Sequence, residues 1–226
     1  MRPHTALSLA CGGLLALALW PALVPAARGE GEDLVSRSEP PLELYLEVEG
    51  REVPIALDRK LELAAPGGKL SLTLRGRPWR TLTLPTLTLR YPRAYHFEYV
   101  REEHHEQWTL NGSDTLAMLF HVPQAPGAED GEVCQVFAQS MREQYGQNGR
   151  MEETAGLQLG GIELPGRRIR ATLAGTITII QDVYARVHGD GSCTVVVLQH
   201  TPTDQGVEPS ETRLLRQQLV ESLRWR

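Results

Sequence analysis

The densest cluster of chemically capable side chains is REEHHEQW, residues 101–108, in which two adjacent histidines stand among three glutamates. Zinc requires three or four ligands that converge on one point, and imidazole and carboxylate groups supply such ligands. Two further histidines lie in segments that we expect to form neighbouring strands. The candidate metal ligands are therefore His96, His104, His105 and His121. A site built from them would support metal-assisted hydrolysis.

A turn at the tip of a hairpin explains the same segment better. Adjacent residues of a strand point to opposite faces of the sheet, so His104 and His105 could not share an ion there. Their spacing also differs from HExxH, in which two histidines lie on one face of a helix. We therefore expect residues 101–108 to form a solvated turn without a cofactor, and the metal site is the alternative.

Cysteine usage predicts one disulfide. Cys11 lies in an N-terminal apolar segment that we expect to be removed, which leaves Cys134 and Cys193. Two cysteines in an exported chain most often form a disulfide, because the compartment is oxidising. We expect their Cα atoms to lie within about 7 Å of each other. The alternative is a reactive thiol with a histidine partner, which no spacing in the sequence supports.

One stretch is basic within an otherwise acidic sequence. It contains no acidic residue between Glu62 and Glu98, and its cations are Lys69, Arg75, Arg77, Arg80, Arg90 and Arg93. Strand alternation could gather several of them on one face beside a tryptophan, a composition that suits an anionic polymer, lipid head groups or a protein partner. The candidate ligand-binding residues are Arg75, Arg77, Trp79 and Arg80. The alternative is an ordinary solvated face with cross-strand ion pairs.

Other catalytic motifs are missing from the sequence. It has no G-x-S-x-G nucleophile elbow and no glycine-rich loop with the lysine of a P-loop. Its formal net charge of −5 argues against a general nucleic-acid binder, which needs a net basic face to displace counterions. The sequence thus indicates no particular reaction.

The N-terminus predicts export. Residues 1–26 combine a short cationic start with an apolar run that ends near Leu23, and Val24 and Ala26 fit a signal-peptidase site. The length of the run and its two prolines argue against a transmembrane anchor. We expect a cleaved signal peptide over residues 1–26 and a disordered leader over residues 27–41. The mature chain is expected to lack a transmembrane segment and to be soluble, in the periplasm or outside the cell.

Leucines alternate with polar residues through much of residues 42–90, which predicts a small antiparallel β unit. Alternation places every second side chain on one face of a half-buried strand. A unit of about 50 residues buries too little apolar surface to be stable alone, so we expect it to pack against the rest of the chain. Trp79 should lie at that junction, with Arg77 and Arg80 beside it at the surface.

Residues 91–226 are predicted to mix strands with two helices. Asn111-Gly112 is a strong hairpin signal. Asp130 is expected to cap a helix that runs to about Tyr145 and is followed by a loop over residues 147–156. The remaining strands are expected at about 157–164, 168–174, 176–187 and 193–200, before a final helix that starts at Pro209-Ser210.

This order of elements predicts an α+β fold, with a curled antiparallel sheet flanked by helices. The stretch from LTLRYPRAYHFEYV through LGGIELPGRRIRA and TITIIQDVYARV to ETRLLRQQLVESLRW resembles a PsbP-like α/β/α sandwich domain over residues 87–226. The likeness lies in the element order and in a terminal helix that ends in Ser-Leu-x-Trp. It implies a binding or assembly role without catalysis, and it transfers no site residues.

The predicted organisation is a signal peptide (1–26), a leader (27–41), a small N-terminal β unit (42–90) and an α+β sandwich domain (91–226). The predicted function is an exported, non-catalytic binding or assembly module of the cell envelope. Its expected partner is a protein or an anionic envelope ligand. The alternative is a metal-assisted hydrolase built on the histidine cluster.

Overall fold

The computed structural model describes residues 35–48, 50–55 and 72–226, so the predicted signal peptide lies outside the described residues. Its largest sheet is antiparallel, with the strand order β6 (His96–Arg101), β7 (Glu106–Asn111), β8 (Thr115–Val122), β12 (Cys193–His200), β11 (Ile177–Val187), β10 (Ile162–Leu173) and β9 (Gly149–Leu159). The apolar run of β12 lies at the centre, because a strand covered on both faces needs apolar side chains on both.

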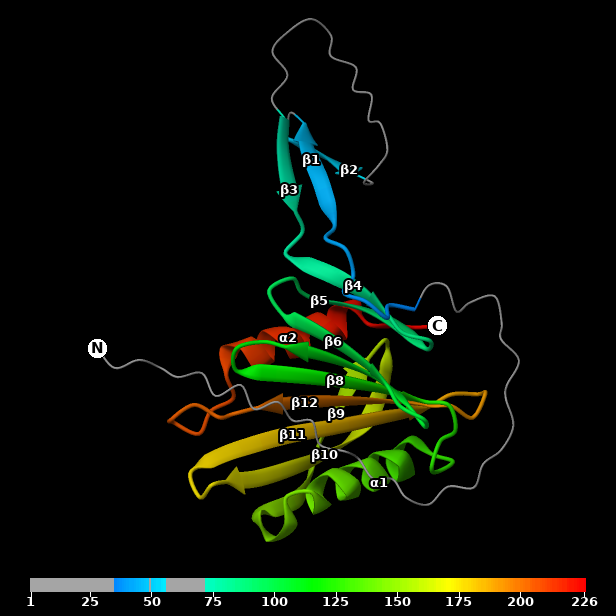
Figure 1. Ribbon diagram of the computed structural model, residues 1–226, viewed down its shortest axis with the longest axis vertical. Coiled ribbons are helices and arrows are strands. Elements are labelled where there is room, and N and C mark those ends of the chain that lie inside the picture. The colour runs from blue at the N-terminus through cyan, green and yellow to red at the C-terminus, as the bar shows by residue number, and fades with distance from the viewer. Residues whose placement is uncertain (1–34, 49, 56–71) are drawn as a thin grey trace, which may run out of the picture. The chain divides into compact units, whose positions relative to one another are not determined.

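Two helices cover opposite faces of this sheet (Figure 1). α1 (Asp130–Glu143) packs on a core that includes Val183, whereas α2 (Ser210–Ser222) packs on a core that includes Tyr184. Consecutive residues of a strand face opposite sides, so these two neighbours on β11 serve different cores. The fold is α+β, as predicted.

Two smaller sheets have three strands each. One has the order β13 (Arg224–Trp225), β5 (Leu87–Pro92) and β4 (Trp79–Thr83), and the other β2 (Arg51–Ile55), β1 (Leu44–Val48) and β3 (Leu72–Gly76). All pairings within them are antiparallel. The strands of the predicted N-terminal β unit are therefore present, but they divide between two sheets.

Strands β4 and β5 contribute to the sandwich core. Leu82, Leu87 and Leu89 are at most 1% exposed and lie in the same cluster as Trp108 and Leu219. By contrast, neither core cluster of the described residues includes a side chain of β1, β2 or β3. The boundary predicted at residue 90 therefore cuts through one core, because alternation indicates that a face is buried but not which element buries it.

Part of the predicted disordered leader is held against the sandwich. The backbone N–H of Ser36 donates to the carbonyl of Thr83 (2.7 Å), and the indole N–H of Trp108 donates to the carbonyl of Ser36 (2.6 Å). Val35 packs against the core, and Pro40 is buried. These bonds use backbone groups of the leader, which its polar composition did not reveal.

Both predicted helices are present, and neither of them is long and apolar enough to cross a membrane. Asp130 does not cap α1 as expected. Its carboxylate instead accepts the backbone N–H of Val187 (2.7 Å), which ties the start of the helix to the end of β11. The hairpin predicted at Asn111-Gly112 is confirmed, with the N–H of Gly112 donating to the carbonyl of Thr115 (2.8 Å).

The segment 147–156, predicted as a loop, is mostly strand. A short 3-10 helix, η2 (Gly146–Asn148), leads into β9, which pairs with β10 as a long hairpin. β9 is an edge strand and many of its residues are exposed. It therefore lacks the apolar alternation by which a half-buried strand is recognised in a sequence.

A pair of identical substitutions tests the assignment of β4 to the sandwich. Leu82→Ala is expected to lower the free energy of unfolding by about 3 kcal/mol, because Leu82 is fully buried. Leu74→Ala, on β3, is expected to change it by less than about 0.5 kcal/mol, because Leu74 is 61% exposed. Urea unfolding followed by circular dichroism measures both. Equal losses would contradict the assignment.

Candidate functional site

The histidine-rich segment forms the predicted turn. Residues 102–105 connect β6 to β7, and the backbone N–H of Glu102 donates to the carbonyl of His105 (2.9 Å). The turn is not solvated throughout, because His105 is 7% exposed and its ring lies 5.7 Å from that of Phe120. Burial lowers the pKa of His105, although the nearby Glu102 favours the charged form. Burial in the interior thus favours the neutral form of this histidine.

Of the other candidate metal ligands, His96 lies far from the turn, whereas His121 lies opposite Glu106 in the register of β7 and β8. His96 begins β6 and His104 follows its end, which separates them by more than about 16 Å at 3.3 Å per residue. His96 is exposed and lies 3.4 Å from Glu98, whereas His121 is on β8, where burial lowers its pKa. The described residues contain no group of three histidine, cysteine, aspartate or glutamate side chains placed to hold a metal. The structure does not bring the four histidines together.

Both cysteines are free thiols, so the structure does not contain the predicted disulfide. The thiol of Cys134 donates to the carbonyl of Val183 (3.2 Å) on β11. Cys193 instead lies opposite Val187, four residues farther along the same strand. Four strand residues span about 13 Å, and a disulfide requires Cα atoms within about 7 Å. The two cysteines face the same core, but they lie at different positions along the direction of β11.

The three candidate arginines are each paired with a carboxylate. The pairs are Arg75–Glu47 (Nε to Oε2, 2.5 Å), Arg77–Glu52 (Nη2 to Oε2, 2.5 Å) and Arg80–Glu39 (Nη2 to Oε1, 3.3 Å). The side chain of Arg80 is only 15% exposed and also donates to the carbonyl of Pro40. These pairs reduce the free positive charge of the segment, and such surface pairs contribute little to stability. The glutamate partners of these arginines lie 25 to 41 positions earlier in the chain, before the basic stretch begins. The local composition of that stretch therefore did not reveal them.

Trp79 lies half-buried among arginines. The Arg90 guanidinium carbon is 5.3 Å from a Trp79 ring centroid, and that of Arg77 is 5.9 Å away. Arg77 lies closer to the ring of Tyr45, at 4.4 Å. Contacts of this kind are cation–π interactions. The predicted proximity of Trp79 and Arg77 is present, but the indole side chain belongs to neither core cluster of the described part of the chain.

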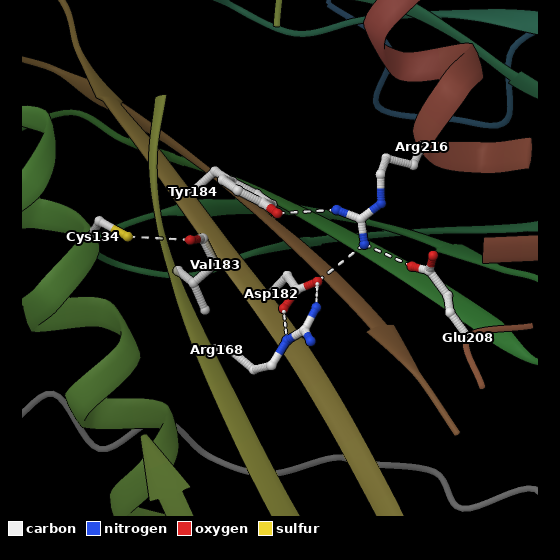
Figure 2. Close-up of polar contacts among 7 residues, drawn as sticks. All are labelled: Cys134, Arg168, Asp182, Val183, Tyr184, Glu208 and Arg216. Atoms are coloured by element: carbon white, nitrogen blue, oxygen red, sulfur yellow. Dashed lines mark hydrogen bonds and ion pairs between the residues drawn. The ribbon is translucent and has the colours of Figure 1, made fainter. Parts of the chain in front are cut away.

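Figure 2 shows a cluster of charged side chains around Asp182, on the face of β11 that α2 covers. The Asp182 side chain is fully buried. Arg168 is its neighbour in the register of β10 and pairs with it through two bonds, Nε to Oδ1 (2.6 Å) and Nη2 to Oδ2 (2.8 Å). Arg216 approaches from α2, and its Nη2 donates to Oδ2 at 3.0 Å. The carboxylate is therefore clamped between the sheet and the helix.

Arg216 connects this carboxylate to two further groups. Its Nη2 also donates to Oε1 of Glu208 (2.7 Å), and its Nη1 donates to the hydroxyl of Tyr184 (3.0 Å). Burial alone would lower the pKa of Arg216, but bonds to these acceptors and to Asp182 raise it above its ordinary value. One guanidinium thus fastens α2 to β11 and to the loop that precedes the helix.

The Asp182 cluster is better suited to holding the fold than to catalysis. Burial alone would raise the pKa of the Asp182 carboxyl, but the bonds and charges of Arg168 and Arg216 outweigh it and hold the pKa below its ordinary value. Both carboxylate oxygens accept bonds from arginines, so neither is free to accept a substrate proton or to attack an electrophile. His200 lies on the same face, 3% exposed, with its pKa lowered by burial.

Sequence analysis did not single out this cluster. Its one signal is an aspartate inside the apolar run TITIIQDVY, because a buried carboxylate needs a charged partner. The partner on the neighbouring strand is 14 residues away and the partner on α2 is 34 residues away. Neither of these sequence separations corresponds to a motif spacing that would identify the partner.

The sheet formed by β1, β2 and β3 has one apolar and one charged face. Leu46 lies between Val53 and Leu74 in the register, and Val48 lies beside Leu72. Leu72 and Leu74 are 48% and 61% exposed. Tyr45, Glu47 and Arg75 alternate with these residues and therefore occupy the opposite face. The apolar face is a surface that the two core clusters of the described residues leave uncovered.

The role of Asp182 is tested by Asp182→Asn, which keeps the shape of the side chain but removes its charge. The free energy of unfolding at pH 7 is expected to fall by about 3 to 5 kcal/mol, because both arginines then lack their buried counter-ion. Since the folded-state pKa is depressed, the native carboxylate stabilises the fold above about pH 4, and this contribution is lost as the pH falls through the folded-state pKa. The variant should lack that part of the acid dependence.

Urea unfolding at pH 7 and at about pH 3 measures both effects. Asp204→Asn is the matched control, because Asp204 is exposed in the loop before α2. A loss of stability as small as that of the control would show that the cluster does not hold the helix to the sheet.

Thiol labelling tests the state of the cysteines. Burial raises the pKa of the Cys134 thiol to about 11 and that of the Cys193 thiol to about 12. Since the thiolate is the reactive form, neither should react with iodoacetamide in the native chain at pH 8, and both should react in urea without a reductant. Mass spectrometry counts the adducts. An unfolded chain that takes up label only after reduction would contradict the free-thiol assignment.

The chain is α+β, and its resemblance to PsbP-like domains over residues 87–226 stays a prediction. Its function has to be inferred from the placement of its own residues. The sequence matches no protein-family model, and a search of curated proteins finds no match to it.

Proposed function

We propose that the chain is an exported, non-catalytic binding or assembly module of the cell envelope, and that the sheet of β1, β2 and β3 is its binding surface. The observation that carries this proposal is the uncovered apolar face of that sheet, where Leu72 and Leu74 are 48% and 61% exposed. Contiguous exposed apolar surface on a folded protein commonly marks an interaction site.

The state of the chemically capable groups supports a non-catalytic role. Asp182 is held by two arginines, and both thiols have raised pKa values. A general base needs access to a substrate proton, and a cysteine nucleophile needs a lowered pKa. Asp182 is thus engaged in holding the sandwich together, and Cys134 and Cys193 are kept in the less reactive thiol form.

The two faces of the small sheet suggest which kind of partner it binds. The arginines of the charged face already have Glu47 and Glu52 as partners, so an anionic ligand would have to displace these carboxylates. On the apolar face Leu72 and Leu74 are exposed, so a partner could cover them without displacing an ion pair of the described residues. A protein segment that buries Leu72 and Leu74 is therefore favoured over an anionic envelope ligand.

Strand edges offer a second means of binding. β3 is an edge strand among the described strands, and its residues Leu72 to Arg75 are exposed. An edge strand presents unpaired backbone groups to which an extended segment can add as a further strand. The sandwich, with its two cores, supplies a folded base to which this sheet is connected through β4.

Site-specific photo-crosslinking in the host tests the proposal. A photoreactive amino acid at position 74 is expected to give an adduct of defined mass, because the side chain lies in the proposed surface. The same residue at position 214 is the control, because Leu214 is similarly exposed (65%) but lies on α2. Absence of a defined adduct at position 74, or equal adducts at both positions, would contradict the binding role.

The same cells test export. The chain should be recovered from the periplasmic or secreted fraction, with an intact mass that corresponds to loss of residues 1–26. Recovery from the cytoplasm with residues 1–26 retained would show that the export part of the proposal is wrong, whatever the crosslinking result.

A further inference from the structure

We propose that the partner of β3 is a second copy of this chain, which adds its own β3 in antiparallel orientation across a two-fold axis at Leu74. This inference rests on the proposed function, because it names the partner of the same sheet. It follows from three features: the difference between the two sheet edges, the self-complementary register of β3, and the charges beside that register.

The two edges of the sheet differ in how well they are protected. The edge strand β2 carries Pro54 and the charged pair Arg51-Glu52. Proline removes a ladder donor, and charges disfavour pairing, so both are typical of edges that avoid association. β3 reads Leu-Thr-Leu-Arg-Gly, has no proline and leaves two leucines exposed. Association through β3 is therefore favoured over association through β2.

The length of β3 fixes the register of a symmetric pair. β3 has five residues, Leu72–Gly76, so pairing all of them with an antiparallel copy puts the centre at Leu74. The two copies of Leu74, the most exposed large apolar side chain of the sheet, then lie directly opposite each other. Leu72 falls opposite Gly76 of the second copy, beside the Arg93 side chain, whose Nη1 lies 3.1 Å from where a Cβ at that glycine would be. A two-fold interface of this kind uses one patch twice and closes at two copies.

The apolar row becomes continuous across such a pair. Within one copy, Val53, Leu46 and Leu74 are neighbours in the register. Pairing at Leu74 extends this row through Leu74, Leu46 and Val53 of the second copy. Directly opposed aliphatic side chains stabilise a sheet, and the exposed leucines gain partners that the described residues of one copy do not provide.

The charged face is compatible with the same register. Arg75 falls opposite Thr73 of the second copy, and Thr73 is itself the register neighbour of Glu47. Arg75 of one copy therefore lies in the same row as Glu47 of the other, with a threonine between them. No like charges lie directly opposite each other in this register. Like charges in that position would destabilise the pair.

The area available predicts weak association. A stable interface buries about 1,200 Å² or more in total, and one five-residue strand with its side chains provides less than this. We therefore expect a monomer–dimer equilibrium that depends on concentration in the micromolar to millimolar range, rather than a permanent dimer.

Sedimentation velocity of the purified chain from about 1 to 500 µM tests the inference. The sedimentation coefficient of the wild type is expected to rise with concentration toward that of a dimer. Leu74→Lys should weaken dimerisation at least about tenfold, because two lysines would face each other at the axis. Leu214→Lys is the control and should behave as the wild type, because Leu214 is similarly exposed (65%) but lies on α2.

A wild type that stays monomeric throughout, or a Leu74→Lys variant that dimerises like the wild type, overturns the inference. Both lysines replace exposed leucines, so neither variant is expected to unfold, and circular dichroism checks this.

Engineered cysteines test the register. Directly opposed residues of antiparallel strands have Cα atoms about 4.5 to 5.5 Å apart, which suits a disulfide. Leu74→Cys is therefore expected to form a disulfide-linked dimer on mild oxidation. Leu72→Cys should not, because the two copies of residue 72 lie about 13 Å apart along the strands. Cys134 and Cys193 are buried and should not interfere. Equal linkage at both positions would overturn the register.

The two proposals fail in different ways. If the photo-adduct at position 74 has the mass of two copies of this chain, it supports both. An adduct with a different protein, together with a monomeric wild type, supports the binding role and overturns the second-copy inference. A wild type that dimerises through Leu74 without any adduct in the host supports self-association and contradicts a binding role in the cell.

Discussion

The fold depends on covering one face of the seven-stranded sheet with α2, and the buried Asp182 carboxylate holds that helix in place. Arg168 reaches it from the neighbouring strand and Arg216 from the helix, at 2.6 to 3.0 Å. A carboxylate with no exposure to water is costly unless its charge and both oxygens are satisfied. The same bonds therefore stabilise the charge and fix the position of the helix relative to the strands. Leu215 and Leu219 can then fill the core beneath it.

Other polar contacts extend this attachment along α2 and its flanks. At the start of the helix, Glu211 accepts the backbone N–H groups of Ser113 and Asp114, and the hydroxyls of Thr212 and Thr115 share a hydrogen bond. Beyond its end, the indole N–H of Trp225 donates to the carbonyl of Leu159. The helix is thus fixed at its start to the loop between β7 and β8, and the residues beyond its end are fixed to β9.

The small sheet is built differently from the sandwich. Its strands pair well through their backbones, but three strands with one uncovered apolar face bury little surface. Ion pairs on its charged face add little, because exposed pairs are screened by solvent. The arginines that composition singled out as a binding face are therefore partly neutralised by glutamates of β1 and β2. The surface with unsatisfied contacts is the leucine-bearing face and edge of β3.

The sequence by itself determined the class of the fold, the two helices and the turn at residues 102–105, because periodicity and turn chemistry are local properties. It did not identify β9, whose exposed edge lacks alternation, or the attachment of β4 and β5 to the main core. Only the tertiary structure decided which groups meet: Asp182 with Arg216, Arg75 with Glu47, and Cys134 with the carbonyl of Val183 rather than with Cys193. These contacts join residues 28 to 49 positions apart, and their distances depend on strand register and helix placement, which no short-range pattern in the sequence encodes.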